Sequence, residues 1–218
     1  AVGCNVIYDM MEYESYYEDL TGSVKDLNLE EYFGTNEVLK VEFIDVGQGD
    51  SSLIITPDGK SMLIDSGEYY AYDAVKSALN AHKITKIDAL VATHPHSDHI
   101  GCMANIIEDY EISTIYMPNA ASTSKSFETL LNIIEKKKLN VIEAKAGTEI
   151  KLGDQVEAQI LAPIDEFYDD TNNYSVVVHL TFGDRSYIFM GDAETIVEEE
   201  LIDSGQNIKA DVIKLGHH

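Results

Sequence analysis

A cluster of potential metal ligands follows a short apolar stretch and constrains the fold more than any other feature of the chain. Residues 93–101, THPHSDHIG, hold three of the 7 histidines and one aspartate within six positions. The preceding residues 87–92, IDALVA, predict a buried strand that ends where the cluster begins. A strand that stops at such a cluster delivers side chains to the edge of a sheet, so we expect a functional site there.

The spacing divides this cluster into two groups of ligands. His94 and His96 are two residues apart, so an extended backbone through Pro95 places both imidazoles on the same side. Asp98 and His99 follow in a turn that enters a helix, where they face a second point. Imidazole nitrogen and carboxylate oxygen suit ions such as zinc. The sequence therefore predicts two divalent metal ions, zinc or manganese; the alternative is a set of surface loop residues.

Four further motifs accompany the cluster. They are residues 41–51, VEFIDVGQGDS; residues 62–67, MLIDSG; residues 189–194, FMGDAE; and residues 214–218, KLGHH. Together with H-x-H-x-D-H they resemble the metallo-β-lactamase superfamily of hydrolases. DVGQGDS, GDAE and GHH resemble in particular the branch that holds the hydrolase domain of ComEC-type DNA-uptake proteins and bacterial surface phosphorylcholine esterases. The resemblance implies an α/β fold, a four-layer αββα sandwich, over about residues 38–218.

The same resemblance implies roles for individual residues. The expected metal ligands are His94, His96, Asp98, His99, Asp192 and His217, and the residues expected to take part in catalysis are Asp65, Asp98 and His218. Asp192, next to the start of a helix predicted over 193–201, would bridge both ions. Asp65 would accept hydrogen bonds from the cluster loop and orient the ligands. Because neighbours on a strand point to opposite sides, only His217 is expected to bind metal, which leaves His218 for the substrate's phosphate or for acid catalysis.

One departure from the family pattern weakens the first ion site. Many members supply a third histidine about twenty residues before the bridging aspartate, and here that position holds Asn172 and Asn173. His179 lies nearby but falls inside a predicted strand, so we expect a partly buried strand histidine. The first ion would keep only His94, His96 and Asp192.

The charge balance bears on the substrate. Asp and Glu number 39 against 15 Lys and Arg, a formal net charge of −24. Such an excess repels polyanions at long range and favours a small ester over long DNA, although bound cations invert the potential locally. No apolar run reaches the roughly 18 residues of a transmembrane segment, and the sequence leaves the oligomeric state open.

The first part of the chain differs from the rest. Residues 1–37 are acidic and tyrosine-rich and predict a spacer, a partly ordered appendage or a binding arm. Residues 38–218 form the expected hydrolase domain, which in relatives continues with Gly-Ser and a further pocket segment. The opening AVGCN resembles a lipobox, so Cys4 would tether the protein outside the cytoplasm; the alternative is an ordinary cysteine in a cytoplasmic protein. A disulfide with Cys102 is not expected.

These observations favour a metal-dependent phosphodiesterase that acts through a metal-bound hydroxide on nucleic acid or a phosphorylcholine-type ester. The alternatives are an amide, thioester or lactone hydrolase of the same fold, and a surface lipoprotein whose degenerate site serves as a binding module.

Overall fold

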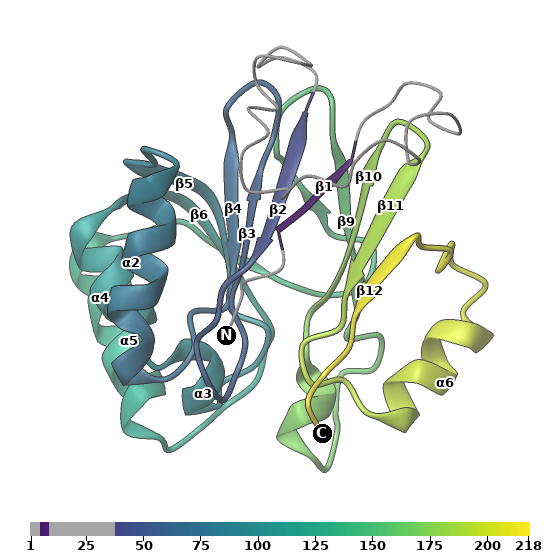
Figure 1. Ribbon diagram of the computed structural model, residues 1–218. Helices are drawn as coiled ribbons and strands as arrows, with labels where there is room; N and C mark the ends of the chain where they lie inside the picture. The colour runs from purple at the N-terminus through teal and green to yellow at the C-terminus, as the bar shows by residue number, and fades with distance from the viewer. Residues whose placement is uncertain (1–4, 9–37) are drawn as a thin grey trace.

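Two facing β-sheets with helices on their outer faces form the protein. The computed structural model describes residues 5–8 and 38–218 (Figure 1). The lipobox hypothesis at Cys4 and most of the tyrosine-rich segment lie outside the described residues. Within the described residues, no helix is both long enough and apolar enough to cross a bilayer.

The first sheet carries the cluster of residues 93–99. Its described strands, in spatial order, are β1 Asn5–Tyr8, β2 Leu39–Phe43, β3 Ser52–Ile55, β4 Ser61–Ile64, β5 Lys86–Val91, β6 Glu111–Met117 and β7 Val141–Glu143. A loop over residues 44–51 joins β2 to β3 and a shorter turn joins β3 to β4; these three strands pair antiparallel, whereas β4 to β7 pair parallel. Parallel neighbours need long crossovers, and these contain α2 Tyr72–Ala81, α3 Ser97–Ile100, α4 Met103–Asp109 and α5 Lys125–Lys137.

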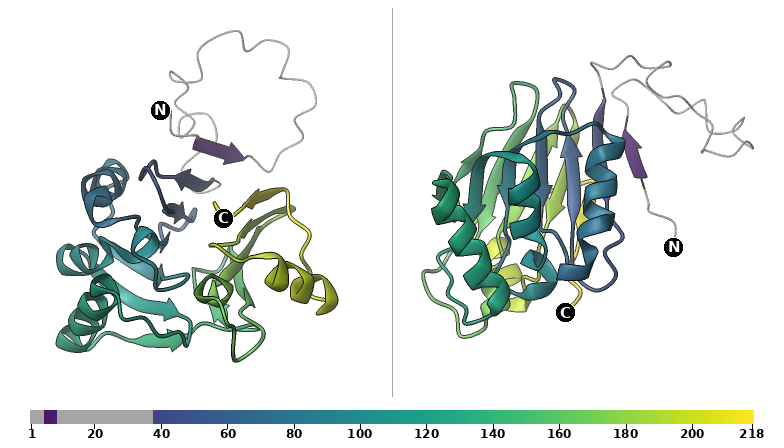
Figure 2. Two further views of the ribbon diagram at one scale, coloured as in Figure 1. Left: turned by 90° about the horizontal axis from the view of Figure 1, so that it is seen from below. Right: turned by 90° about the vertical axis from the view of Figure 1, so that its left-hand side faces the viewer.

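The second sheet faces the first. Its described strands run in the order β12 Val212–Lys214, β11 Arg185–Phe189, β10 Val177–Phe182, β9 Glu157–Ala162 and β8 Glu149–Ile150. Helix α6, Thr195–Asp203, covers its outer face, and α2, α4 and α5 cover the outer face of the first sheet (Figures 1 and 2). This arrangement confirms the predicted αββα sandwich.

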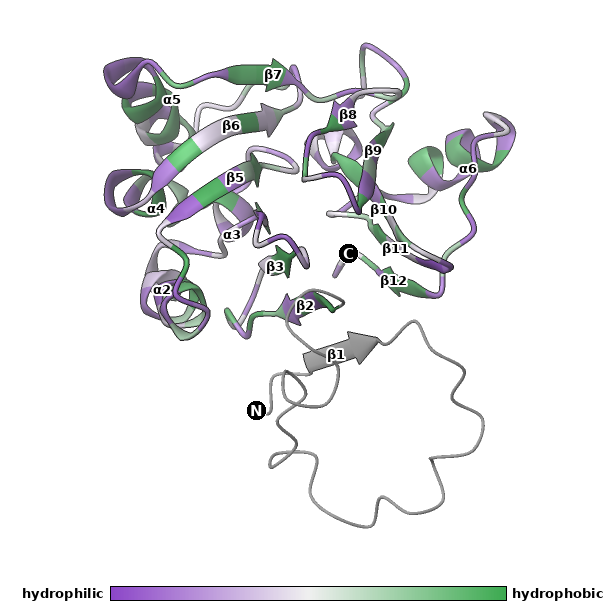
Figure 3. Cartoon of the chain, turned by 90° about the horizontal axis from the view of Figure 1, so that it is seen from above, coloured by the Kyte–Doolittle hydropathy of each residue, from purple (hydrophilic) through white to green (hydrophobic). Residues whose placement is uncertain are grey.

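Alternating side chains along the strands build the apolar layers between these elements. On β5, Leu90 packs toward the helices, whereas Ala89 and Val91 face the second sheet. On β11, Phe189 joins the layer between the sheets and Ile188 the layer beneath α6. Hydrophobic colour accordingly recurs along strands of both sheets (Figure 3). The sandwich is therefore fixed on both faces, and its strand ends are held in place.

Three local predictions need correction near the site. Asp98 and His99 lie on the one-turn helix α3 rather than in a turn before a longer helix. Helix α6 begins at Thr195, with Glu194 as its N-cap, rather than at residue 193. Asp192 therefore lies two residues before the N-cap. The last strand, β12, ends at Lys214, so His217 and His218 do not lie on a strand as expected.

The fold predicts an unreactive thiol at Cys102. Its side chain is fully buried, Sγ donates to Ser66 O at 2.9 Å, and burial raises the pKa of the thiol to about 11. Because the thiolate is the reactive form, a Cys4→Ser variant should leave DTNB almost unreacted at pH 8 and release one equivalent after unfolding in guanidinium. Prompt labelling of the folded variant would contradict the burial of the Cys102 thiol.

Candidate metal centre

The candidate site lies where loops from both sheets meet at one edge of the sandwich. Asp65 directly follows β4, and the cluster of residues 93–99 follows β5. From the second sheet come Asp192, after β11, and His217, after β12. The chain ends in this region, near α3 and the loop before α6 (Figure 1).

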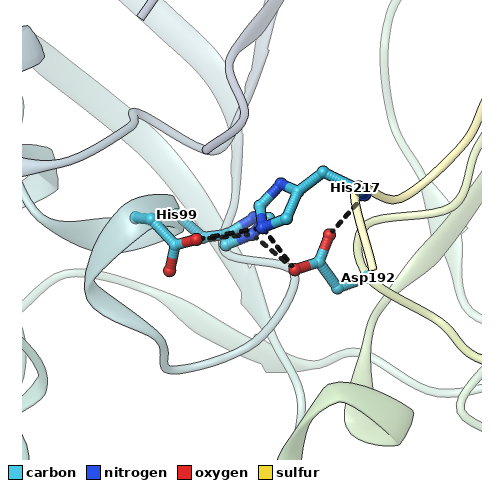
Figure 4. A group of neighbouring side chains, drawn as sticks. His99, Asp192 and His217 are labelled. Carbon is cyan, nitrogen blue, oxygen red and sulfur yellow. Dashed lines mark hydrogen bonds and ion pairs between the residues drawn. The ribbon is translucent and has the colours of Figure 1, made fainter. Parts of the chain in front are cut away.

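The Asp192 carboxylate is the centre of the site. Its Oδ2 lies 3.0 Å from His99 Nε2 and 3.2 Å from His217 Nε2. His217 Nε2 also lies 3.1 Å from Asp98 Oδ2. Figure 4 shows His99, Asp192 and His217 converging on one point from both sheets. One donor atom from each of these residues falls within 4.8 Å of all the others. This set of two imidazoles and two carboxylates fits a divalent cation.

Asp65 fixes the orientation of His99. It accepts hydrogen bonds from Thr93 N at 2.8 Å and from Thr93 Oγ1 at 2.7 Å, and it lies 2.8 Å from His99 Nδ1. With Nδ1 bonded to this carboxylate, Nε2 is the ring nitrogen directed at Asp192. A carboxylate in this position fixes the tautomer and raises the basicity of a ligating histidine. The geometry is the one expected for Asp65 from the sequence.

The electrostatics separate the histidines. Burial disfavours charge on His99, but Asp65 and Asp192 outweigh it and raise the pKa of this imidazole to about 10. Burial and the neighbouring histidines lower the pKa of His94 to about 2. Burial disfavours the charged form of Asp192, but His99 and the other imidazoles outweigh it and lower the pKa of this carboxyl. The Asp65 and Asp192 carboxylates thus favour a positive charge at His99, and a bound cation would supply that charge in place of the proton.

His94 and His96 form the second group, as their spacing predicts. His94 Nε2 lies 3.0 Å from His96 Nδ1 and 3.9 Å from Asp192 Oδ2. On its other side, His94 Nδ1 lies 3.1 Å from Thr93 Oγ1 and 3.3 Å from Ser175 Oγ. The Nε2 atom of His94 therefore faces both His96 and the shared carboxylate.

The asparagines at the position of the family's third histidine serve another contact. Asn172 and Asn173 donate to the Glu194 carboxylate at 3.3 and 3.0 Å, and Asn173 Oδ1 accepts from Glu194 N at 3.2 Å. Asn172 Oδ1 is buried and has no hydrogen-bond partner among the described residues, so a bound water or cation would satisfy it. His179 is a buried β10 residue that contacts Lys209 O at 3.2 Å, which confirms the prediction of a strand histidine.

Both terminal histidines reach Asp192, contrary to the expectation that neighbours point to opposite sides. His218 Nε2 lies 3.3 Å from Asp192 Oδ2, close to the 3.2 Å of His217. The reason is that β12 ends at Lys214, so strand alternation does not apply, and Gly216 packs directly on residue 192. A Cβ at Gly216 would lie 2.9 Å from Asp192 Cα. His218 is the more exposed side chain, at 48% against 27%, so it faces solvent.

Ser175 was not predicted as part of the site. Its Oγ accepts from Asp192 N at 3.0 Å and contacts His94 Nδ1, so one hydroxyl connects residues from both sheets. The available signal was its place in the sequence Asn-Asn-Tyr-Ser, which the missing histidine had already singled out.

An αββα sandwich with a histidine and aspartate cluster at the edge of its sheets defines a class of metal-binding proteins. The chain belongs to the metallo-β-lactamase superfamily, whose family model matches residues 44–218. Membership implies divalent metal binding and, for most members, metal-dependent hydrolysis.

Individual relatives agree with this assignment. The chain is 29% identical over 196 residues to ComE operon protein 3 of Bacillus subtilis (strain 168), a match that covers 82% of this chain and 25% of the relative. It is 30% identical over 104 residues to ribonuclease Z of Aeropyrum pernix, covering 47% of this chain and 31% of the relative. The structure of Rm3 metallo-beta-lactamase superposes with a TM-score of 0.56 at 13% identity, over 80% of this chain and 74% of that one. The chain thus spans about a quarter of ComE operon protein 3.

The shared carboxylate predicts a measurable loss on substitution. For the wild type, Mn²⁺ or Zn²⁺ at about 100 times Kd should stabilise the fold by about 2.7 kcal/mol, which is about 5–10 °C in Tm for a domain of this size. Asp192→Asn should abolish this shift, whereas Asp184→Asn, an exposed carboxylate in the β10–β11 turn, should preserve it. Thermal melts with and without metal provide the measurement. An unchanged shift in the Asp192 variant would remove this residue from the metal centre.

Proposed function

We propose that the chain is a metal-dependent phosphodiesterase in which Asp98, His99, Asp192 and His217 hold one divalent ion and His94, His96 and Asp192 hold a second. The observation that carries the proposal is that Asp192 Oδ2 lies within 3.0–3.3 Å of the imidazoles of His99, His217 and His218, which come from two segments, and 3.9 Å from His94 Nε2. A carboxylate in that position accounts for both groups of candidate ligands at once.

Three further side chains have proposed roles in orienting ligands and contacting the substrate. When bound, the ions would supply Lewis-acid activation of water at neutral pH and stabilise the negative charge that develops on the phosphoryl oxygens. Asp65 keeps the Nε2 atom of His99 directed at the ion. Asp98 is less buried than Asp192, and its Oδ2 lies 3.1 Å from His217 Nε2, so both side chains are placed to hold the same ion. His218, on the solvent side, is placed to contact the phosphate or to protonate the leaving oxygen.

Two observations bear on the substrate. An open cavity of about 540 Å³ next to the site is lined by His218, Glu194 and Glu198, and these carboxylates disfavour a long polyanion there. Tyr69 and Tyr70 are 72% and 57% exposed, and Tyr70 packs beside Gly47 in the β2–β3 loop. Exposed rings of this kind stack on nucleobases and also bind quaternary ammonium groups.

Nucleic acid is the substrate that the relatives favour, since one of them is named ribonuclease Z. A phosphorylcholine-type ester is the substrate that the acidic cavity favours. Parallel assays with a single-stranded oligonucleotide and with p-nitrophenyl phosphorylcholine separate the two substrates, because each leaves a different product. The proposal also includes a lipid anchor at Cys4 that holds this superfamily member outside the cytoplasm. Labelling with a palmitate analogue in cells tests the anchor.

The second candidate is a hydrolase of an amide, thioester or lactone on the same fold. The fold likeness to Rm3 metallo-beta-lactamase favours it, whereas the asparagines in place of the third histidine oppose it. A surface binding module with a degenerate site is the third candidate, and the commitment of Asn172 and Asn173 to Glu194 favours it.

Activity separates these candidates directly. With Mn²⁺ or Zn²⁺ added, the wild type should hydrolyse bis-p-nitrophenyl phosphate and leave nitrocefin intact. His96→Ala should lower kcat by about 100-fold or more, since it removes half of one imidazole pair at an ion that stabilises the transition state. His179→Ala, a buried histidine away from the site, is the control for general damage to the fold. Cleavage of nitrocefin without cleavage of the phosphodiester would favour the second candidate, and absence of metal binding the third.

The two groups of ligands predict unequal metal affinities. Isothermal titration should show one tight ion and one weaker ion, because the loop that supplies a third histidine in many family members is bonded to Glu194 instead. His94→Ala should remove the weaker event, and His99→Ala should remove the tighter one. Two events of equal affinity in the wild type, or the loss of both events in either variant, would contradict this division.

A further inference from the structure

Three segments that carry candidate metal ligands or their supports converge on one residue, Asp50, in the loop between β2 and β3. Asp50 N donates to Asp98 O at 3.2 Å, and Asp50 O accepts from Gly67 N at 2.8 Å. The Asp50 carboxylate pairs with the Lys214 ammonium at the end of β12. The loop that contains DVGQGDS thus contacts the segments of Asp65, Asp98 and His217, and a carboxylate oxygen of its own Asp50 lies within 4.8 Å of donor atoms of Asp65 and His99.

The backbone of this loop lies directly against that of Asp98. A Cβ at Gly49, whose φ is +104°, would lie 1.9 Å from Asp98 O, so only glycine fits this approach. Two residues later, Ser51 Oγ donates to Asp65 O at 3.1 Å. The glycine in this motif therefore serves a close contact with the metal-binding loop.

The ion pair joins the two sheets beside the site. Asp50 is 8% exposed, and the Lys214 side chain is 22% exposed. Burial raises the pKa of Asp50, and the nearby Lys214 ammonium opposes that rise. Lys214 Nζ also donates to Leu215 O at 3.0 Å. A buried carboxylate strongly favours a fixed cationic partner, and this partner lies three residues before His217.

We propose that the Asp50–Lys214 ion pair positions residues 214–218 so that His217 reaches Asp98 and Asp192. Asp50 and Lys214 are positioning residues in this proposal, because the Asp50 carboxylate is paired with Lys214 and neither belongs to the group formed by Asp98, His99, Asp192 and His217. The inference rests on the proposed metal-dependent function, since it assigns a role in holding the tighter ion. It also gives a physical reason for the pairing of DVGQGD with Lys-Leu-Gly-His-His in one chain.

The test measures metal affinity in the full chain with Mn²⁺ and with Zn²⁺. Lys214→Met keeps the aliphatic stem and removes the charge, Lys214→Arg keeps the charge, and Lys209→Met is the control at an exposed lysine that precedes β12. We expect Lys214→Met to weaken the tighter ion by about 10–100-fold, the range for residues that orient ligands. Lys214→Arg should recover most of that affinity, and Lys209→Met should bind as the wild type does.

A second background separates positioning from general stability. In His217→Ala, Lys214→Met should cause no further loss of affinity, whereas in His96→Ala it should cause the full loss. Asp50→Asn removes the charge of the other partner, so it tests the same ion pair if a Lys214 variant does not fold. A Lys214→Met protein that binds the tighter ion like the wild type, or loses the same affinity with and without His217, overturns the inference. A wild type that binds no metal overturns the proposed function instead.

Discussion

The structure depends on a carboxylate from one sheet meeting imidazoles from the other. Asp192 follows β11 of the second sheet, and its Oδ2 lies 3.0 Å from His99, which α3 presents from the first sheet. The contact is buried on both sides, so its charges are compensated by each other and by Asp65. Removing one partner from a buried ion pair typically costs about 3–5 kcal/mol. The edge of the sandwich is therefore held together by the same groups that would bind a cation.

This arrangement explains why the supporting residues are so numerous. Thr93 bonds to Asp65 through both its backbone and its hydroxyl, and Ser175 bonds to Asp192 N and His94. Each bond restricts a side chain that would otherwise adopt several rotamers. A metal centre built this way is oriented before an ion arrives, which is what hydrolysis by an activated water requires. The acidic surface, with a net charge of −24, attracts cations and limits the substrates that approach.

Sequence alone predicted the fold class and the hydrogen bonds from the cluster loop to Asp65, whereas the metal ligands themselves stay a prediction. It did so because strand alternation and the H-x-H-x-D-H spacing are local properties of the chain. The error at His217 and His218 arose where alternation was extended past the end of β12, a boundary that depends on pairing with β11. The roles of Ser175 and of the Asp50–Lys214 ion pair were not predicted. These contacts join residues 81 and 164 positions apart, and only the packing of the two sheets brings them together.

The central claim is that the Asp192 carboxylate is shared by cations held from both sheets. Anomalous diffraction from crystals soaked in Mn²⁺ or Zn²⁺ tests it most directly, because it locates the ions without reference to activity. The account predicts a strong anomalous peak about 2.0–2.2 Å from Asp192 Oδ2 and His99 Nε2, with a weaker second peak beside His94 and His96. Crystals that take up metal elsewhere and leave Asp192 bonded only to the histidines would contradict it.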